Sequence, residues 1–427
     1  EEPGACLRAS EVKPKLDRFI MKRSNVKIIP SFYIDEANSE ALDYKMRFRV
    51  CGEATISNDK MLWKNYVNNI NINKKNRRPK ADIHKNYFGN MLSRNEQSLE
   101  KVDEKIKATV FYSGGIDMEI ICFNSGLMKI ISDELLSAFF LMHNFGTRQN
   151  KGFGSFVTDD IITREKENKI LPLLRSYADA IFYVDYLKSK TGDTTTDMTT
   201  DMTTDMLDDI YMISALMKSG INNSCSQNYP DDYYKGFIFR YFLNEPFAND
   251  KKYMKNLFDN NVELEGKYIR GLLGLHDNIT FRDNIYNKIV TIRDANSFVE
   301  EFNNPIIKRF NNPVFYKPIK DHLFIIPKEI PKLLLGHLFK FEWNQNQSGN
   351  LAIPESFKRS GDSKEYKGTL SDFLIAFMQD FNDKTNSEEN TNYTKNTKSL
   401  ADMRDSKYDR VKNRKFKLRK VLGVSKK

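Results

Sequence analysis

A short glycine-rich segment that follows an apolar stretch most narrowly limits the folds open to this chain. Residues 141–156 read LMHNFGTRQNKGFGSF. Because glycine has no Cβ, Gly146, Gly152 and Gly154 allow tight backbone turns and a close approach to a ligand. The segment therefore predicts a helix that runs into a tight loop, with a strand after the loop.

The side chains of this loop indicate a phosphate ligand. Arg148 and Lys151 place positive charge beside exposed backbone N–H groups, and that combination binds phosphate. Phe153 offers an aromatic ring on which a base can stack. A backbone nest, two cations and a stacking ring together favour RNA over a nucleotide cofactor.

The segments before the loop predict a hairpin and a capped helix. Residues 105–112 and 117–123 alternate apolar and polar side chains on either side of a Ser-Gly-Gly turn, as two antiparallel strands do. Ser132 is a suitable N-cap for the helix that follows, and Gly146 is a suitable C′ stop. One helical face carries four large apolar side chains, Leu135, Leu136, Phe139 and Phe140.

The element after the loop completes an α+β pattern. Residues 155–158 read SFVT and predict a strand. Hairpin, helix, loop and strand in this order form the second half of a ferredoxin-like unit. The expected fold class is therefore α+β, with ferredoxin-like lobes and added helical segments.

Further elements follow from the same periodicities. Strands are expected at 43–51, 288–293, 313–319 and 322–327, and helices at 165–188, over most of 207–280 and at 368–381. Residues 195–206 repeat TTDM three times. We interpret this repeat as a low-complexity linker, since no glycine turn or bidentate Glu arranges its carboxylates around a metal ion.

Composition excludes several classes of protein. No run of about 18 apolar residues is present, and residues 1–10 lack an apolar signal core, so we expect neither a membrane span nor a secretory signal. The four cysteines are scattered and form no CxxC pair, which argues against a zinc site and fits a reduced cytoplasm. No P-loop, HExxH, G-x-S-x-G or EF-hand pattern occurs, so no cofactor or metal is expected.

The positive charge is concentrated in two segments, a first run at residues 74–80, which read KKNRRPK, and the tail from residue 404 onward. The net charge is +10, and residues 404–427 alone hold eleven Lys or Arg and two Asp, which leaves the remaining chain close to neutral. Such basic runs are either solvated segments or nucleic-acid contacts whose affinity falls with salt. The basic residues that we consider as RNA contacts are Lys74, Lys75, Arg77 and Arg78 in the first run and Arg414, Lys415, Lys417, Arg419 and Lys420 in the tail.

The helix followed by GTRQNKGFGSF resembles the glycine-rich loop of the RAMP superfamily, the RNA-binding subunits of type III-like CRISPR effector complexes. Two weaker similarities lie downstream, in GKYIRGLLGL at 266–275 and in the strand region at 302–319. The matching loop positions are Gly146, Arg148, Lys151, Gly152, Phe153, Gly154 and Ser155.

The resemblance implies a subunit that binds guide RNA and possibly target RNA, works with other effector subunits in antiviral defence, and contacts no membrane. It also implies two ferredoxin-like lobes. The expected division is a first lobe at 1–188 with a basic insertion at 58–100 and the glycine-rich loop at 146–155, a linker at 189–206, a second lobe at 207–381, a disordered segment at 382–399 and a basic tail at 400–427.

Two other functions stay open on sequence alone. An RNA-processing endonuclease of the same superfamily could use His143, beside the loop, as a general base, although a helix-end packing role fits this residue better. His84 is a weaker candidate for that role, and Asp82 and Asp117 have no motif that marks them as metal ligands. An RNA-recognition-motif protein would need KGFGSFV at 151–157 and KGFIFRYF at 235–242 on central strands, and both depart from the motif.

Overall fold

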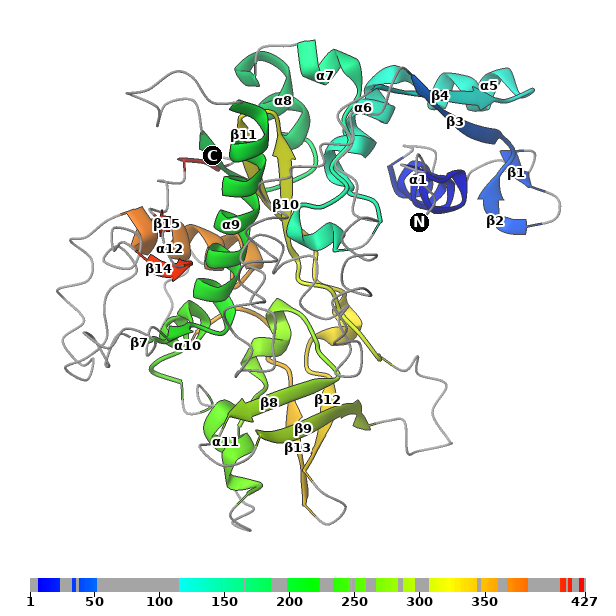
Figure 1. The fold of residues 1–427 in the computed structure, drawn as a ribbon. Helices are drawn as coiled ribbons and strands as arrows, with labels where there is room; N and C mark the ends of the chain where they lie inside the picture. The colour runs from blue at the N-terminus through cyan, green and yellow to red at the C-terminus, as the bar shows by residue number, and fades with distance from the viewer. Residues whose placement is uncertain are drawn as a thin grey trace, which may run out of the picture. The chain divides into compact units, whose positions relative to one another are not determined.

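The computed structural model describes residues 7–23, 33–35, 38–51, 115–146, 148–163, 166–185, 198–222, 233–245, 247, 250–258, 266–282, 287–295, 307–343, 347–359, 367–382, 408–411, 414–416 and 422–425. The chain divides into two compact units, Glu1–Leu174 and Arg175–Lys427, which are described separately (Figure 1). Helices and small antiparallel sheets alternate along the chain, which confirms the α+β class.

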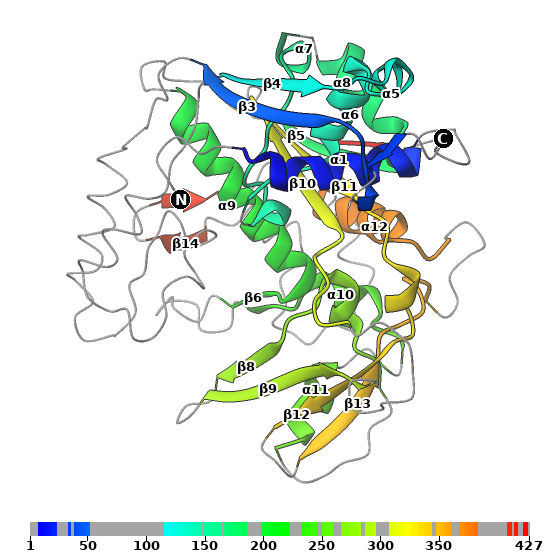
Figure 2. The same ribbon diagram turned by 90° about the vertical axis from the view of Figure 1, so that its right-hand side faces the viewer.

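Unit 1 combines helices with two short antiparallel pairs of strands. Its elements are α1 (Ala9–Arg23), β1 (Ile34–Asp35), β2 (Asn38–Leu42), β3 (Lys45–Cys51), β4 (Gly115–Ile121), α5 (Ser125–Ile130), α6 (Asp133–Met142), the 3-10 turn η2 (Gln149–Lys151), α7 (Asp159–Thr163) and most of α8 (Lys166–Arg175). Strands β3 and β4 lie side by side (Figure 2) and pair from Lys45 opposite Ile121 to Cys51 opposite Gly115. The predicted partner strand at 105–112 lies outside the described residues, so the complete ferredoxin-like sheet stays a prediction.

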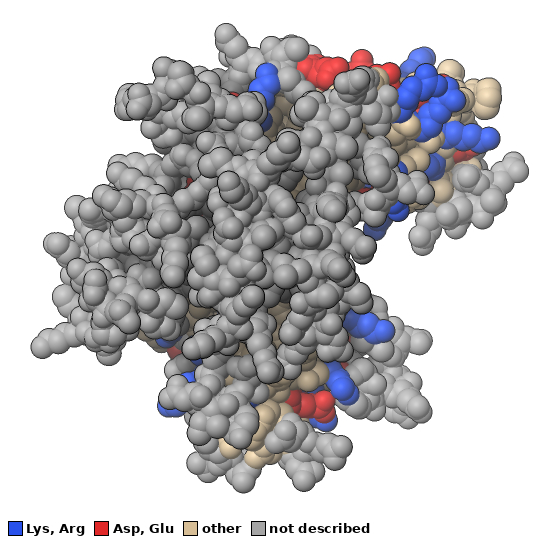
Figure 3. Space-filling model, viewed as in Figure 1, with Lys and Arg blue, Asp and Glu red and all other residues tan. Residues whose placement is uncertain are grey.

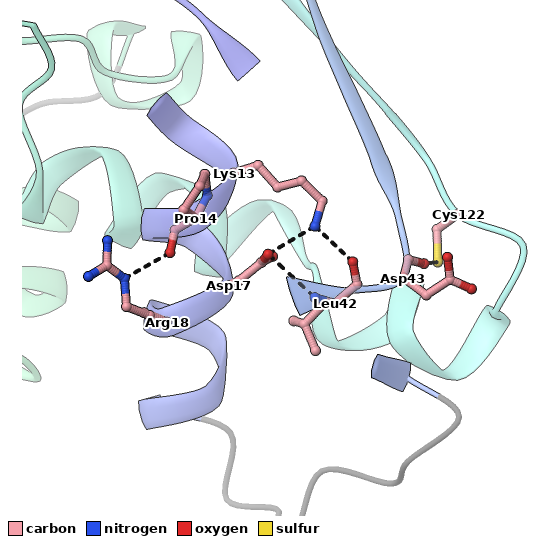
Figure 4. A network of polar contacts seen from close by, with 7 residues as sticks. All are labelled: Lys13, Pro14, Asp17, Arg18, Leu42, Asp43 and Cys122. Atoms are coloured by element: carbon pink, nitrogen blue, oxygen red, sulfur yellow. Dashed lines mark hydrogen bonds and ion pairs between the residues drawn. The ribbon is translucent and has the colours of Figure 1, made fainter. Parts of the chain in front are cut away.

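Helix α1 is joined to β2 by a buried carboxylate. Asp17 accepts hydrogen bonds from Lys13 Nζ at 2.9 Å and from the Leu42 N–H at 3.4 Å, and Lys13 also donates to the Leu42 carbonyl at 2.8 Å (Figure 4). Asp17 is 2% exposed, so its charge needs these partners. The contact fixes α1 against the strands of unit 1.

Helix α6 begins as predicted and ends differently. The Ser132 Oγ accepts a hydrogen bond from the Leu135 N–H at 3.2 Å, which confirms the N-cap. The helix ends at Met142 because His143 is extended, with φ −132° and ψ 145°. The prediction that Gly146 is the C′ stop is therefore wrong, since Gly146 comes later, inside the loop.

The strand predicted at 155–158 does not form, because these residues lead into the helix α7. Ser137 Oγ lies 2.9 Å from Thr158 Oγ1 and donates to Asp160 Oδ1 at 2.9 Å, and Thr158 also donates to Asp160. This polar network joins α6 to the start of α7 and leaves residues 155–158 irregular.

Unit 2 contains two four-stranded antiparallel sheets, ordered β10-β11-β5-β16 and β13-β12-β9-β8. The first part of unit 2 contains β5 (Ala180–Asp185), α9 (Met198–Lys218), α10 (Phe237–Tyr241), α11 (Asp250–Asn256) and the 3-10 helix η4 (Ile269–Leu273). The remaining elements are β6 (Ile221–Asn222), β7 (Tyr233–Tyr234), β8 (Asn278–Arg282), β9 (Asn287–Asp294), β10 (Val314–Ile319), β11 (His322–Pro327), η6 (Lys332–Leu334), β12 (Leu338–Glu342), β13 (Ser348–Ala352), α12 (Leu370–Asn382), β14 (Tyr408–Val411), β15 (Arg414–Phe416) and β16 (Leu422–Ser425).

Several sequence predictions for unit 2 are confirmed. The strands expected at 288–293, 313–319 and 322–327 correspond to β9, β10 and β11, and the helix expected at 368–381 corresponds to α12. The α12 side chains Phe373 and Phe377 pack against Phe237 of α10, with ring centroids 5.5 and 5.3 Å apart. These rings form an aromatic core at α10 and α12.

Two predictions in the central part of the chain need correction. The helix predicted at 165–188 stops at Arg175, and residues 180–185 form β5, which pairs with β11 and β16. The expected linker at 189–206 is only partly a connection, because α9 begins at Met198 and includes most of the TTDM repeat. The two expected lobes and their boundaries stay predictions.

Candidate functional site: the glycine-rich loop

The glycine-rich loop is closed by one backbone hydrogen bond. The Phe145 N–H donates to the Gly154 carbonyl at 3.0 Å. A Cβ at Gly154 would lie 1.7 Å from the Phe145 oxygen, and the backbone there has φ +66°. Gly154 is therefore required for loop closure itself, whatever the loop binds.

The remaining glycines turn the chain inside the loop. Gly146 and Gly152 also have positive φ, +77° and +81°, and the Lys151 N–H donates to the Arg148 carbonyl at 2.8 Å within the turn η2. Arg148 itself is left-handed, with φ 55° and ψ 29°. An L residue rarely adopts this conformation, which costs about 1–2 kcal/mol. The loop thus holds a strained arginine at the start of its 3-10 turn.

The two cations of the loop lie close enough to repel each other. Burial and the nearby Arg148 charge lower the pKa of Lys151. Within the part of the chain that the structure describes, the Lys151 ammonium has no hydrogen-bond or ion-pair partner. A bound anion would relieve this repulsion, which is the behaviour expected of a phosphate site.

Helix α1 braces the loop from one side. Glu11 Oε1 accepts a hydrogen bond from the Gly146 N–H at 2.7 Å and from Lys15 Nζ at 3.0 Å. Lys15 also donates to Gln149 Oε1 at 2.9 Å and to the Asn144 carbonyl at 3.3 Å. The Gly146 N–H is therefore engaged by Glu11. Sequence reasoning missed this brace, because its only local signal is the i, i+4 pair Glu11 and Lys15.

His143 lies at the base of the loop in an aromatic environment. Its Nδ1 is 2.8 Å from the Phe139 carbonyl, and its ring centroid lies 4.6 Å from that of Phe139 and 5.5 Å from that of Phe19. These contacts are those of a residue that packs and caps the end of α6. No observation favours a role for His143 as a general base.

The other predicted site residues are described to different extents. Phe153 and Ser155 are half-buried. Arg414 and Lys415 belong to β15, while Lys74, Lys75, Arg77, Arg78, Lys417, Arg419, Lys420, His84 and Asp82 lie outside the described residues. Asp117 is exposed on β4, and no group of His, Cys, Asp or Glu in the described residues has the arrangement of a metal site.

Unit 1 also carries a cationic surface that sequence reasoning missed. Figure 3 shows Lys and Arg side chains gathered over β3, β4 and α5, where Lys45, Arg49 and Lys129 are exposed. Arg47 belongs to the same surface and forms an ion pair with Glu119 of β4. The alternation of β3 produces this surface, since every second residue of a strand points the same way.

The RNA-recognition-motif alternative is contradicted. Of the first KGF segment, Lys151 ends the turn η2 and the residues after Gly154 are irregular. Of the second, residues 237–241 form the helix α10, with Phe237, Ile238 and Phe239 buried. Neither segment is the central strand that the motif requires, and the apolar side chains of the second segment pack into the core of unit 2.

Comparison with known proteins identifies a family over most of the chain. The family model of the Cmr1 N-terminal domain matches residues 1–221, and that of the Cmr1 C-terminal domain matches residues 233–405. Searches of curated proteins and of solved structures gave no match. Among the described helices, none combines the length and apolar character needed to cross a membrane.

Proposed function

This chain belongs to the Cmr1 family, whose members are RAMP-type subunits of the type III-B CRISPR Cmr complex, and we propose that its glycine-rich loop binds the phosphate backbone of RNA in that complex. The RNA is the guide RNA and, when bound, the target RNA. Other Cmr subunits are the partners, and the biological role is antiviral defence. In this proposal the subunit binds RNA without cutting it.

The observation that carries the proposal is the pairing of two cations at a 3-10 turn that lies between two left-handed residues, Arg148 and Gly152. Arg148 precedes the 3-10 turn and Lys151 ends it, and no carboxylate among the described residues of unit 1 forms an ion pair with Lys151. A phosphate offers the Lys151 ammonium a negative charge and acceptor oxygens. Because the Gly146 N–H is engaged by Glu11, the backbone donors left for the ligand are those at Gly152 and Gly154.

A double substitution tests this proposal. Arg148→Ala with Lys151→Ala removes two phosphate contacts, which should reduce the salt slope of single-stranded RNA binding by about 1.4. If the variants bind alike at about 1 M salt, this slope predicts roughly 25-fold weaker binding at about 0.1 M salt. Fluorescence anisotropy with labelled RNA over a salt series measures both quantities.

The matched control is Arg18→Ala with Lys22→Ala, which removes two exposed cations of unit 1 outside the loop and outside the cationic surface. Circular dichroism melts of both variants report whether the fold is kept. Equal losses in the loop variant and the control would show that only general charge acts, and the glycine-rich loop would then have no binding role of its own.

A further inference from the structure

The two downstream segments that the loop does not explain, 235–242 and 266–275, meet in unit 2 around one buried ring. Lys235 Nζ lies 5.4 Å from the ring centroid of Phe239, and the guanidinium carbon of Arg270 lies 5.7 Å from it. A cation within about 6 Å of an aromatic face is attracted to it. Phe239 thus holds one cation from each segment.

A buried carboxylate fixes the position of the arginine. Asp250 is 0% exposed, and its Oδ2 accepts hydrogen bonds from Arg270 Nε at 3.1 Å and from the Arg270 N–H at 3.3 Å. The Arg270 side chain is only 13% exposed. Because both partners are buried, α11 and η4 hold the ion pair in one orientation.

The lysines beside this pair exceed the negative charge available. Burial, followed by the charges of Arg270 and Lys255, lowers the pKa of Lys251, and burial also lowers the pKa of Lys235. Asp250 is the one described carboxylate whose charge acts on both lysines. Among the described residues, neither lysine has a hydrogen bond or an ion pair.

We propose that Lys235 and Lys251, backed by the Asp250–Arg270 pair, form a second phosphate-binding site, which takes backbone phosphates of single-stranded RNA. We call this group of four residues the Asp250 cluster. The proposal rests on the proposed function for the identity of the ligand, because the RNA bound at the loop supplies further phosphates. The cluster adds a contact in the C-terminal domain of the family, away in sequence from the loop.

The chemistry of the cluster fits phosphate. Lys235 is half-buried and Lys251 is the more exposed of the two, so both lysines reach solvent beside a fixed guanidinium. Phosphate oxygens accept several charge-assisted hydrogen bonds at once and would relieve the mutual repulsion of the cations. An acidic peptide offers the same charge in a less compact form, and the test below separates the two.

The first test uses the full chain and the RNA titration described above. Lys235→Ala with Lys251→Ala should reduce the salt slope by about 1.4 and weaken RNA binding roughly 25-fold at about 0.1 M salt. Lys252→Ala with Lys332→Ala, two exposed lysines of unit 2, is the matched control and should bind nearly as the unchanged chain does. Equal binding by the cluster variant and this control would overturn the proposal.

The second test needs no variant and so cannot fail through misfolding. Acetic anhydride labels lysines of the unchanged chain, and mass spectrometry reads the extent at each one. Bound single-stranded RNA should protect Lys235 and Lys251 several-fold and leave Lys252 labelled as before. Protection by poly-glutamate at matched charge, but not by RNA, would overturn the proposal in favour of an acidic protein partner.

The two proposals fail in different ways. If the loop variant binds RNA normally while the cluster variant does not, the role of the loop is wrong and the cluster stands. If RNA protects Lys151 of the unchanged chain but not Lys235 or Lys251, and the cluster variant binds RNA as the unchanged chain does, the cluster is wrong and the role of the loop stands. Addition of the two losses, in free energy, in the fourfold variant would support two separate phosphate sites.

Discussion

The glycine-rich loop and the Asp250 cluster present cations to solvent by opposite means. The loop is built from backbone, since Gly154 closes it and a left-handed Arg148 starts its turn. The cluster is built from side chains, since Phe239 and Asp250 hold residues that come from three separate segments. The loop therefore depends on conformation, and the cluster depends on a buried charge.

This difference separates the effects of substitution in the two regions. A side chain added to the loop alters the backbone path, whereas a side chain removed from the cluster leaves a buried ion without a partner. The fold is expected to suffer most from the second change, because an uncompensated buried charge costs more than one strained residue.

The largest effect is expected for Asp250→Ala. Arg270 would keep its charge in a buried position without its carboxylate, so the free energy of unfolding should fall by about 3–5 kcal/mol. Urea denaturation followed by circular dichroism measures the loss. Asp277→Ala is the control, because its Arg309 partner is 78% exposed and the pair is screened by solvent. An unfolding midpoint as unchanged for Asp250→Ala as for this control would show that the ion pair does not organise the cluster.

The next effect is expected for Gly154→Ala. The new Cβ would overlap the Phe145 carbonyl at a position with φ +66°, so the loss should be about 2–4 kcal/mol. Gly146→Ala is the matched control, because it has φ +77° but nothing within 4 Å of the added Cβ. Strain alone should then cost about 1–2 kcal/mol. Equal thermal melts for the two variants would contradict the closing role of Gly154.

A smaller effect is expected for Lys15→Met, which breaks the brace between α1 and the loop. The substitution removes hydrogen bonds to Glu11, Gln149 and Asn144, and should cost about 1–2 kcal/mol. Arg18→Met on the same helix is the control, since Arg18 is exposed and, within the described residues, bonds only the Pro14 carbonyl of its own helix. Faster amide hydrogen exchange at residues 144–149 in Lys15→Met alone would confirm the brace, and unchanged exchange would refute it.

The smallest effect concerns pH and compares the two regions directly. Lys151 and Lys235 both have a lowered pKa, through burial first in each case. A bound phosphate favours the protonated amine, so RNA affinity should fall as pH rises toward the ordinary lysine pKa, by roughly fivefold per lysine at about 0.1 M salt. Lys151→Arg and Lys235→Arg should each remove their share, because arginine stays charged. Profiles that match the unchanged chain would show that neither lysine contacts RNA.

The loop could be predicted from sequence because all its parts are contiguous. The three glycines Gly146, Gly152 and Gly154 predict a tight turn, and Ser132 predicts the start of the helix before it. What the sequence did not provide was the end of that helix or the absence of a following strand. Both depend on contacts with distant residues, since Glu11 binds the Gly146 N–H and Ser137 binds the segment that was expected to be a strand.

The Asp250 cluster could not be predicted from sequence. Its lysines look like ordinary surface lysines, and only tertiary packing brings Phe239, Asp250 and Arg270 together. The same limit explains the error at residues 180–185. Their apolar residues continue the helical spacing of the preceding segment, and only pairing with β11 makes them a strand.

The left-handed arginine has a consequence for any attempt to stabilise this protein. Arg148→Gly would remove a strain of about 1–2 kcal/mol and add about 0.5–1 kcal/mol of unfolded-chain entropy. The folded chain would thus be about as stable as before, or slightly more so, while the loop would lose one of its two cations. A screen for heat resistance would accept this replacement, and only a screen for RNA binding would reject it. Arg148 is therefore a position where tolerance to mutation and usefulness to the complex are expected to diverge.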